Sequence, residues 1–153
     1  GTSAGIIYHY FENKEDLLNQ LYLHVKTKCA EQVLTTVKEN AAAENKIRQI
    51  LRNIFYYYIE NWDELSFAEQ YENSPLIQPA TATQVSKLLE PVIRLFEQAL
   101  SECRLKPLGV QTLLTLSFGA VSSLAKLYIF KKMSVDDRVI QKELEAIWDM
   151  IKI

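Results

Sequence analysis

A chain of 153 residues has the length of about one domain and is long enough for a substantial core, and its 48% hydrophobic and 24% charged residues are typical of an ordinary globular protein. Only 4 glycines and 4 prolines interrupt it, which favours long helices over many turns, so we expect an all-α fold. The net charge of −2 excludes binding of a polyanion through overall charge, and a nucleic-acid partner would need a local patch.

A long helix is predicted directly after an aromatic opening stretch. Asn13 stands where an N-cap is expected and Asp16 follows three residues later, which is an asparagine form of the capping box. Apolar residues then recur at helical spacing for about six turns. They are Leu17, Leu18, Leu21, Tyr22, Val25, Cys29, Val33, Leu34 and Val37. The helix predicted over residues 14–37 is therefore long enough to link two parts of the protein.

Two helices are predicted after a polar break at residues 38–45. A second apolar stripe covers residues 47–62, and a short third helix covers residues 65–71. The third helix is expected to stop before Ser74, because the residue before a proline is pushed out of the helical region.

Residues 76–83 are expected to form a loop before the next apolar series. That series runs from Val85 to Cys103 and keeps its helical phase across Pro91. The phase predicts one kinked helix, with a break at Pro91 as the alternative.

The last two predicted helices follow a turn at residues 106–109. Residues 110–131 are apolar on nearly every face, and the final helix is announced by Ser134 with Asp137 three residues later. No internal repeat and no strand-like alternation interrupts this pattern. The predicted architecture is an all-α helical bundle.

The opening run GTSAGIIYHYFENKEDL, residues 1–17, closely resembles the second half of the DNA-binding domain of TetR-family transcriptional repressors. In that family a tight turn ending in glycine leads to a serine cap, a short recognition helix with aromatic residues, and the entry to a long helix. The resemblance implies that residues 1–37 are the C-terminal part of a helix-turn-helix domain and its connecting helix. Residues 38–153 would then form an effector-binding and dimerisation domain.

The same resemblance assigns candidate contacts with double-stranded operator DNA. Ala4, Gly5 and His9 would face bases, while Tyr8 and Lys14 would contact phosphates. Small residues at the start of a recognition helix allow close approach to base edges, and Ser3 can cap that helix. The full set of candidate DNA-binding residues is Thr2, Ser3, Ala4, Gly5, Tyr8, His9 and Lys14.

Members of that family carry two more helices before this run, one that crosses the DNA backbone and one that supports the recognition helix. We therefore expect the natural protein to be longer at its N-terminus than the sequence given. The alternative is a helical ligand-binding or protein-interaction module on the same scaffold that does not bind DNA. It is motivated by the missing helices, by the net charge of −2, and by Ile6, which stands where many relatives have a hydroxyl group that bonds phosphate.

Bulky aromatic residues are concentrated between positions 54 and 71, too many for one narrow stripe. Together with two rings from later helices they predict an apolar pocket for a small effector, which the resemblance also implies. The predicted pocket residues are Phe55, Tyr58, Trp62, Phe67, Tyr71, Phe96 and Phe118. The alternative is a solid aromatic core with amphipathic tyrosines at the surface.

Residues 107–125 carry no charge, and this composition is compatible with a membrane span. The serine and threonine residues within the run and the absence of flanking aromatic belts count against a span, and no membrane partner is expected. A helix apolar all round is more often buried by its own core and by a partner subunit. The resemblance implies a homodimer whose predicted interface residues are Leu116, Gly119, Ala120, Ser123, Leu127, Ile140, Leu144, Ile147 and Trp148.

We do not expect the protein to be an enzyme, and we expect it to bind neither a metal nor a cofactor. His9 and His24 belong to no metal-binding or nucleophile spacing, and no glycine-rich phosphate loop occurs. Cys29 and Cys103 are read as two structural thiols of a cytoplasmic protein. The prediction is a ligand-responsive DNA-binding transcriptional regulator, acting as a repressor under a small, largely apolar effector.

Overall fold

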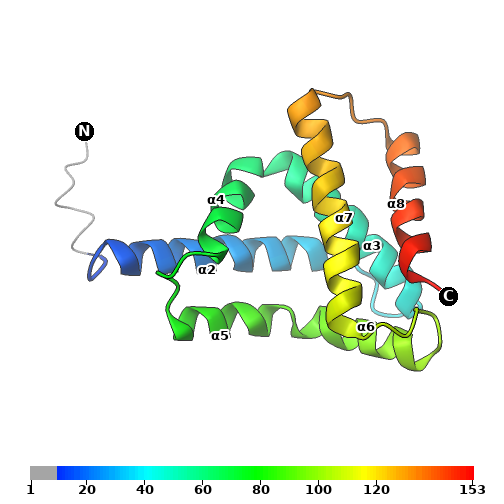
Figure 1. Cartoon of the computed structure of the whole chain (residues 1–153), viewed down its shortest axis with the longest axis horizontal. Helices are drawn as coiled ribbons and strands as arrows, with labels where there is room; N and C mark the ends of the chain where they lie inside the picture. Colours follow the sequence, from blue (N-terminus) through cyan, green and yellow to red (C-terminus); the bar gives the residue numbers. More distant parts are fainter. Residues whose placement is uncertain (1–9) are drawn as a thin grey trace.

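The computed structural model describes residues 10–153, and within these residues it contains seven α-helices and no strand (Figure 1). The helices are α2 Lys14–Leu34, α3 Ala43–Glu60, α4 Trp62–Glu72, α5 Pro79–Leu88, α6 Glu90–Ser101, α7 Val110–Lys131 and α8 Asp137–Ile151. The all-α helical bundle predicted from the pattern is confirmed.

Helix α3 is central, because it packs against α2, α4, α6, α7 and α8. Helices α2 and α5 lie side by side, and α7 and α8 lie toward the opposite end of the molecule from the start of α2 (Figure 1). The beginning of α2 is thus held well away from the two last helices.

The start of α2 follows the predicted cap. The Asn13 side chain accepts a hydrogen bond from the Asp16 amide at 2.9 Å, and the Glu12 amide donates to the Asp16 carboxylate at 3.1 Å. These bonds satisfy amides that would otherwise lack a partner in the first turn. The helix ends at Leu34. The apolar stripe had predicted a later end, at residue 37.

The kinked helix predicted across Pro91 is two helices, so the alternative of a break is correct. Helix α5 already begins at Pro79, inside the predicted loop, and α6 begins at Glu90. Both prolines lie in the first turn of their helices, where a missing amide costs no hydrogen bond.

The cap of the last helix also differs from the prediction. Asp136 rather than Ser134 is the N-cap, since its carboxylate accepts from the Arg138 amide at 2.8 Å and the Val139 amide at 3.4 Å. A carboxylate at this position also interacts favourably with the helix dipole.

Two clusters of apolar side chains hold the helices together. The larger one joins α3, α6, α7 and α8 and includes Val33 of α2 and Leu65 of α4. Its fully buried members include Ile47, Phe55, Phe96, Leu113 and Ile140. The smaller one joins α2, α4 and α5. Its members are Tyr22, Val25, Ala68, Tyr71 and Val85. The first half of α2 is therefore fastened mainly by a core of its own.

A buried asparagine supplements the smaller cluster. The Asn19 side-chain amide donates to the Leu76 carbonyl and the Glu15 carbonyl, both at 2.9 Å, and its oxygen accepts from the Gln78 amide at 2.9 Å. The Asn19 amide also lies 3.2 Å from the Tyr71 hydroxyl. One side chain thus ties the α4–α5 loop to α2.

We expect Asn19→Ala to lower the free energy of unfolding by about 2 kcal/mol, because it leaves loop groups without partners in a partly buried site. The measurement is urea unfolding followed by circular dichroism. Gln20→Ala is the matched control, since Gln20 bonds only Asp16 on the exposed side of the same helix and should change stability by less than about 0.5 kcal/mol. Equal losses in both variants would contradict the assignment.

Among residues 10–153, α7 is the one helix long and apolar enough to cross a membrane by length and composition. Its face with Leu113, Ser117, Val121 and Ala125 is fully buried. That face belongs to the core of the bundle, where α7 packs on α3.

Candidate functional site

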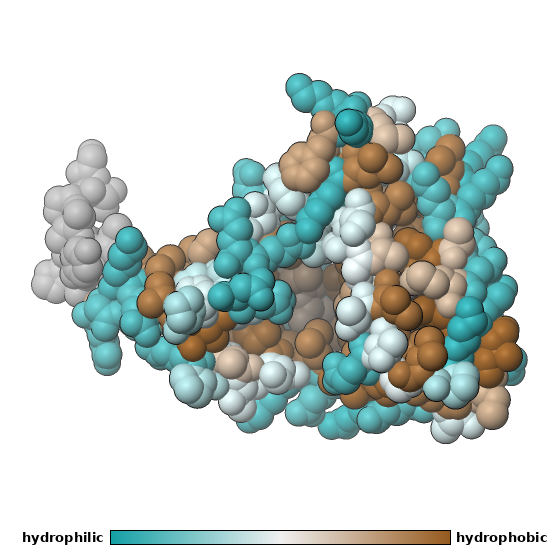
Figure 2. All heavy atoms as spheres, in the orientation of Figure 1, coloured by the Kyte–Doolittle hydropathy of each residue, from teal (hydrophilic) through white to brown (hydrophobic). Residues whose placement is uncertain are grey.

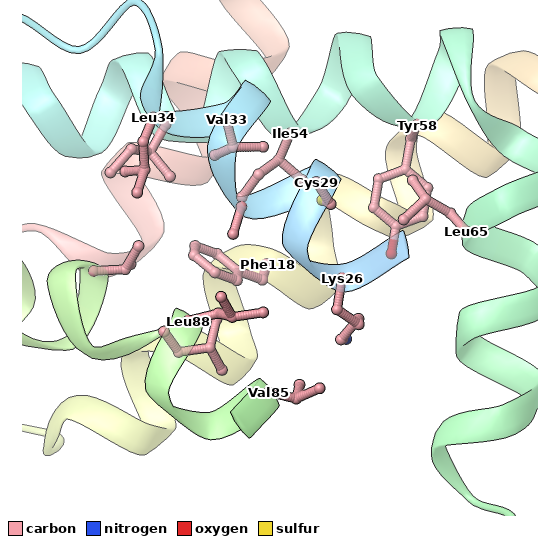
Figure 3. Close-up of a pocket in the computed structure, with 14 residues that line it drawn as sticks. Lys26, Cys29, Val33, Leu34, Ile54, Tyr58, Leu65, Val85, Leu88 and Phe118 are labelled. Atoms are coloured by element: carbon pink, nitrogen blue, oxygen red, sulfur yellow. The ribbon is translucent and has the colours of Figure 1, made fainter. Parts of the chain in front are cut away.

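A cavity of about 160 Å³ lies between α2, α3, α4, α5, α6 and α7 (Figure 3). An apolar cavity of this order is large enough to hold a benzene-sized ligand. Its lining residues are Lys26, Cys29, Ala30, Val33, Leu34, Ile50, Ile54, Tyr58, Leu65, Val85, Leu88, Leu89, Val92 and Phe118. The space-filling view shows the molecule hollowed, over hydrophobic residues, between α4 and α7 (Figure 2).

Three lining residues carry a polar group, and the other eleven are apolar. The Tyr58 hydroxyl donates to Glu69 at 2.8 Å, and the other Glu69 oxygen pairs with the Lys126 ammonium at 2.7 Å. Burial, followed by the bond to Glu69, raises the pKa of Tyr58 above its ordinary value, so this residue is a neutral phenol at physiological pH. Its proton is already engaged by the protein.

The thiol of Cys29 is the second polar group. Burial raises the pKa of Cys29 to about 11, while the nearby Lys26 ammonium lowers it in part. At neutral pH the group is therefore an uncharged thiol that behaves as a small hydrophobic side chain. Cys103, by contrast, is exposed.

We expect thiol reagents at pH 8 to modify Cys103 at least about 100-fold faster than Cys29, because only about one Cys29 in a thousand is a thiolate there and that thiol is shielded. Rates measured by mass spectrometry on the unchanged protein and on Cys103→Ser separate the two sites. A single common rate would contradict the enclosed position of Cys29.

Ion pairs tie α4 to the two flanking helices. The Lys28 ammonium donates to both Glu64 oxygens, at 2.7 and 2.9 Å, and lies 3.4 Å from the Asn61 side-chain oxygen. The Lys26 ammonium lies 3.6 Å from Glu72. Since Glu69 reaches Lys126 on α7, the cavity is bordered by charged contacts from α2 to α7.

The outer side of α7 exposes apolar and small residues at spacings of three and four. Leu116, Gly119, Ser123 and Leu127 are exposed, with Leu127 at 45%. Hydrophobic side chains appear over α7 and α8 on the face seen in Figure 2. Contiguous exposed apolar surface of this kind is typical of an interaction site.

Comparison with known proteins decides the family. Residues 42–152 match the family model described as tetracyclin repressor-like, C-terminal domain, of the TetR type. The chain belongs to the TetR family.

Individual relatives agree with this TetR assignment. A TetR-family transcriptional regulator from Vibrio parahaemolyticus, described as putative, has 30% identity and a TM-score of 0.83 over 99% of this chain and 82% of its own. An uncharacterized HTH-type transcriptional regulator of Haemophilus influenzae is 35% identical over 74 residues, which are 48% of this chain and 40% of that relative. The match thus spans less than half of the curated relative. Both relatives are named as transcriptional regulators, and neither is named as an enzyme.

A more distant neighbour is the transcriptional regulator FadR of Bacillus subtilis, solved in complex with stearoyl-CoA. It has 19% identity and a TM-score of 0.64 over 97% of this chain and 80% of its own. At this identity the likeness concerns the TetR fold alone.

Two of the seven residues predicted for the TetR effector pocket, Tyr58 and Phe118, line the cavity. Phe55 and Phe96 are fully buried in the larger cluster and do not reach it. The other three rings pack elsewhere. Trp62 meets Phe130 edge-on, while Phe67 stacks on Tyr71 in the smaller cluster. Five of the seven predicted rings therefore pack against other side chains instead of lining the cavity, which is the arrangement described by the alternative of an aromatic core.

Sequence reasoning missed most of the lining, above all the five residues of α2, from Lys26 to Leu34. Cys29, Val33 and Leu34 belong to the recognised apolar stripe, but that stripe was read as a packing face. Lys26 has no such signal, because a lysine on an amphipathic helix usually faces solvent.

The predicted TetR-like dimer interface is only partly available. Ala120 and Ile147 are half-buried, and Leu116, Gly119, Ser123 and Leu127 are exposed. Ile140, Leu144 and Trp148 point into the protomer's own core, where they are 0%, 8% and 2% exposed, so the prediction is corrected at these three positions. The apolar stripe of α8 packs against α3 and α7 of the same protomer. The outer face of α8 is therefore formed by other residues.

Six of the predicted DNA contacts lie outside the residues that the structure describes; they are Thr2, Ser3, Ala4, Gly5, Tyr8 and His9. Lys14 is the first residue of α2 and is exposed. Within residues 10–153, no group of three or more histidine, cysteine or acidic side chains is arranged to hold a metal ion.

Proposed function

We propose that this TetR-family chain is the ligand-sensing part of a DNA-binding transcriptional regulator, and that its effector occupies the cavity beside α2. One observation carries the proposal: α2 supplies five of the lining residues and begins at Lys14, inside the run of residues 1–17 that resembles part of a DNA-binding domain. A ligand in the cavity therefore touches the helix that leads to the DNA-reading segment.

The mechanism is a population shift between two positions of α2. A ligand that fits the cavity better in one position favours it, and its effect on operator affinity is limited by that difference in affinity. The smaller cluster and Asn19 join α2 to α4 and α5, so these elements respond together. The proposed output is repression in the cytoplasm, relieved by the effector.

The proposed effector is small and largely apolar. Eleven apolar lining residues support this, and no cofactor enters the mechanism. The stearoyl-CoA bound by the FadR neighbour carries a long apolar chain, which is in keeping with an apolar ligand in this fold.

The proposed regulator is a homodimer joined through the outer faces of α7 and α8. The exposed residues Leu116, Gly119, Ser123 and Leu127 are small or apolar at helical spacing, and Ala120 and Ile147 border them. A second copy would cover this surface. Two copies would place two recognition helices on two half-sites, which gives an affinity that one copy lacks.

The test uses the natural full-length protein and DNA from upstream of its own gene, with scrambled DNA as competitor, in fluorescence anisotropy at two salt concentrations. We expect binding at least about 1,000-fold tighter than to scrambled DNA and weaker at the higher salt. Ala30→Phe, which fills the cavity from α2, should keep this binding and lose its response to effector. Binding no tighter than to scrambled DNA would favour the module that does not bind DNA.

A further inference from the structure

The cavity has one charged group whose bonding capacity the described protein leaves unused. The Lys26 side chain is 26% exposed, and its ammonium lies 3.6 Å from Glu72 and 5.7 Å above the centre of the Tyr22 ring. Neither contact is within hydrogen-bond distance, and no other described residue accepts a hydrogen bond from this ammonium. The side chain is thus half-buried, while its ammonium stays accessible and can donate a hydrogen bond to an anion that enters the cavity.

Lys28, two residues further along α2, shows the contrast. Its ammonium donates to both oxygens of Glu64 and reaches Asn61, so its donors are occupied by α4. The two lysines thus have different roles: Lys28 joins helices, whereas Lys26 lines the cavity with its donors open.

The other polar groups of the lining do not compete for an anion. The Tyr58 hydroxyl donates a hydrogen bond to Glu69, and Cys29 is an uncharged thiol in a buried setting. Glu69 is itself paired with Lys126. The positive charge of the lining is therefore confined to one position.

The apolar part of the lining extends away from that charge. Along α2 it runs from Lys26 to Leu34, eight residues or about 12 Å of helix rise. Figure 3 shows Lys26 beside Val85, with Leu34 on the far side and Phe118 between. Charge and apolar surface are therefore separated along the cavity.

We infer that the effector is an amphiphile with an aliphatic chain and an anionic head group, whose head binds the Lys26 ammonium and whose chain lies along α2 toward Leu34. The inference rests on the proposed function and names the chemical class of its ligand. The shared chemistry of the head is an anionic oxygen group, either a carboxylate or a phosphate.

Glu72 does not block this site. Its side chain is 53% exposed and its contact with Lys26 is long, so it turns to solvent at little cost when another anion arrives. A ligand head bonded directly to the ammonium forms a charge-assisted hydrogen bond, which the Glu72 contact at 3.6 Å does not.

The experiment is calorimetric titration of the natural full-length protein with hexanoate and hexyl phosphate as anionic probes, and hexanol and hexylamine as neutral and cationic ones. We expect at least one anionic probe to bind about tenfold or more tightly than hexanol, and hexylamine to bind more weakly than hexanol. The better anionic probe identifies the head group.

Variants assign the preference to Lys26. Lys26→Met should remove the tenfold preference, measured as the ratio of the affinities for the anionic probe and the alcohol within the same variant, and Lys26→Arg should restore it. Lys87→Met is the matched control, because Lys87 lies exposed on α5 beside the lining residue Leu88 and does not line the cavity itself. Ala30→Phe should weaken all probes that enter the cavity.

The outcomes separate the two proposals. Equal binding of hexanol and both anionic probes, all lost in Ala30→Phe, would overturn the role of Lys26 and leave the cavity as a ligand site. Binding of none of the four probes would overturn the cavity as the site for an aliphatic effector, and the head-group inference with it. A preference that persists in Lys26→Met would place the anion elsewhere.

Discussion

Leu127→Glu is expected to separate the proposed homodimer into folded monomers. Leu127 is 45% exposed in the protomer and lies on the same face of α7 as Leu116 and Ser123. A two-fold interface carries each substitution twice, and every unpaired carboxylate buried there costs several kcal/mol. We therefore expect the dimer dissociation constant to rise by about 100-fold or more.

The measurement is sedimentation equilibrium of the natural full-length protein, with circular dichroism to show that the fold persists. Leu21→Glu is the matched control, since Leu21 is 42% exposed but lies in the first half of α2, the helix whose start is at the opposite end of the molecule from α7 and α8 (Figure 1). The control should remain a dimer. A dimeric Leu127→Glu variant would show that the outer face of α7 is not the interface.

Operator binding provides a second readout of the same change. A monomer presents one recognition helix to one half-site, so Leu127→Glu should also weaken specific DNA binding, although Leu127 lies on α7 and not at the start of α2.

Phe55→Ala is expected to lower the free energy of unfolding by about 3–5 kcal/mol, the range for removing a large aromatic side chain from a core. Phe55 is 0% exposed on the central helix, and its ring meets Tyr128 edge-on with centroids 5.6 Å apart. The same ring also meets Tyr56 edge-on, at 5.3 Å. Urea unfolding measures the loss.

Phe118→Ala is the comparison that separates core from cavity. The Phe118 ring already faces empty space on one side, so its removal should cost less than half as much as removal of Phe55. It should instead change the affinity for ligands that enter the cavity. A larger stability loss for Phe118→Ala than for Phe55→Ala would contradict the placement of these two rings.

Local features of the fold are predictable because their causes are local. The Asn13 side chain reaches an amide three residues away, so the start of α2 can be read from four positions. The bounds of α7 follow from a largely apolar stretch between Gly109 and the lysines at 131 and 132, in which Lys126 is the one earlier charge. At Pro91 two local signals disagree, because the apolar periodicity favours one helix and the proline geometry favours two. The structure has two helices, since proline lacks the amide that a continuous helix needs.

The candidate site depends on contacts between distant segments. Phe55 and Tyr58 stand three residues apart on α3, yet one fills the core and the other lines the cavity. The difference arises from which neighbour each ring meets, Tyr128 of α7 or Glu69 of α4, and no pattern within α3 encodes that choice.

The same limit applies to the outer helices. The apolar stripe of α8 was assigned to a partner subunit, whereas Ile140, Leu144 and Trp148 pack against their own protomer. An apolar stripe shows that a face is buried, but not which surface buries it.

Family, helix content and the cap of α2 thus follow from the order of residues alone, because they depend on short-range spacing and on a dense motif in residues 1–17. The cavity, the Lys26 ammonium at its border and the exposed face of α7 arise only once six helices pack together. Burial is a property of surfaces brought into contact, so residues of the same type and spacing have different roles according to the helix that they meet.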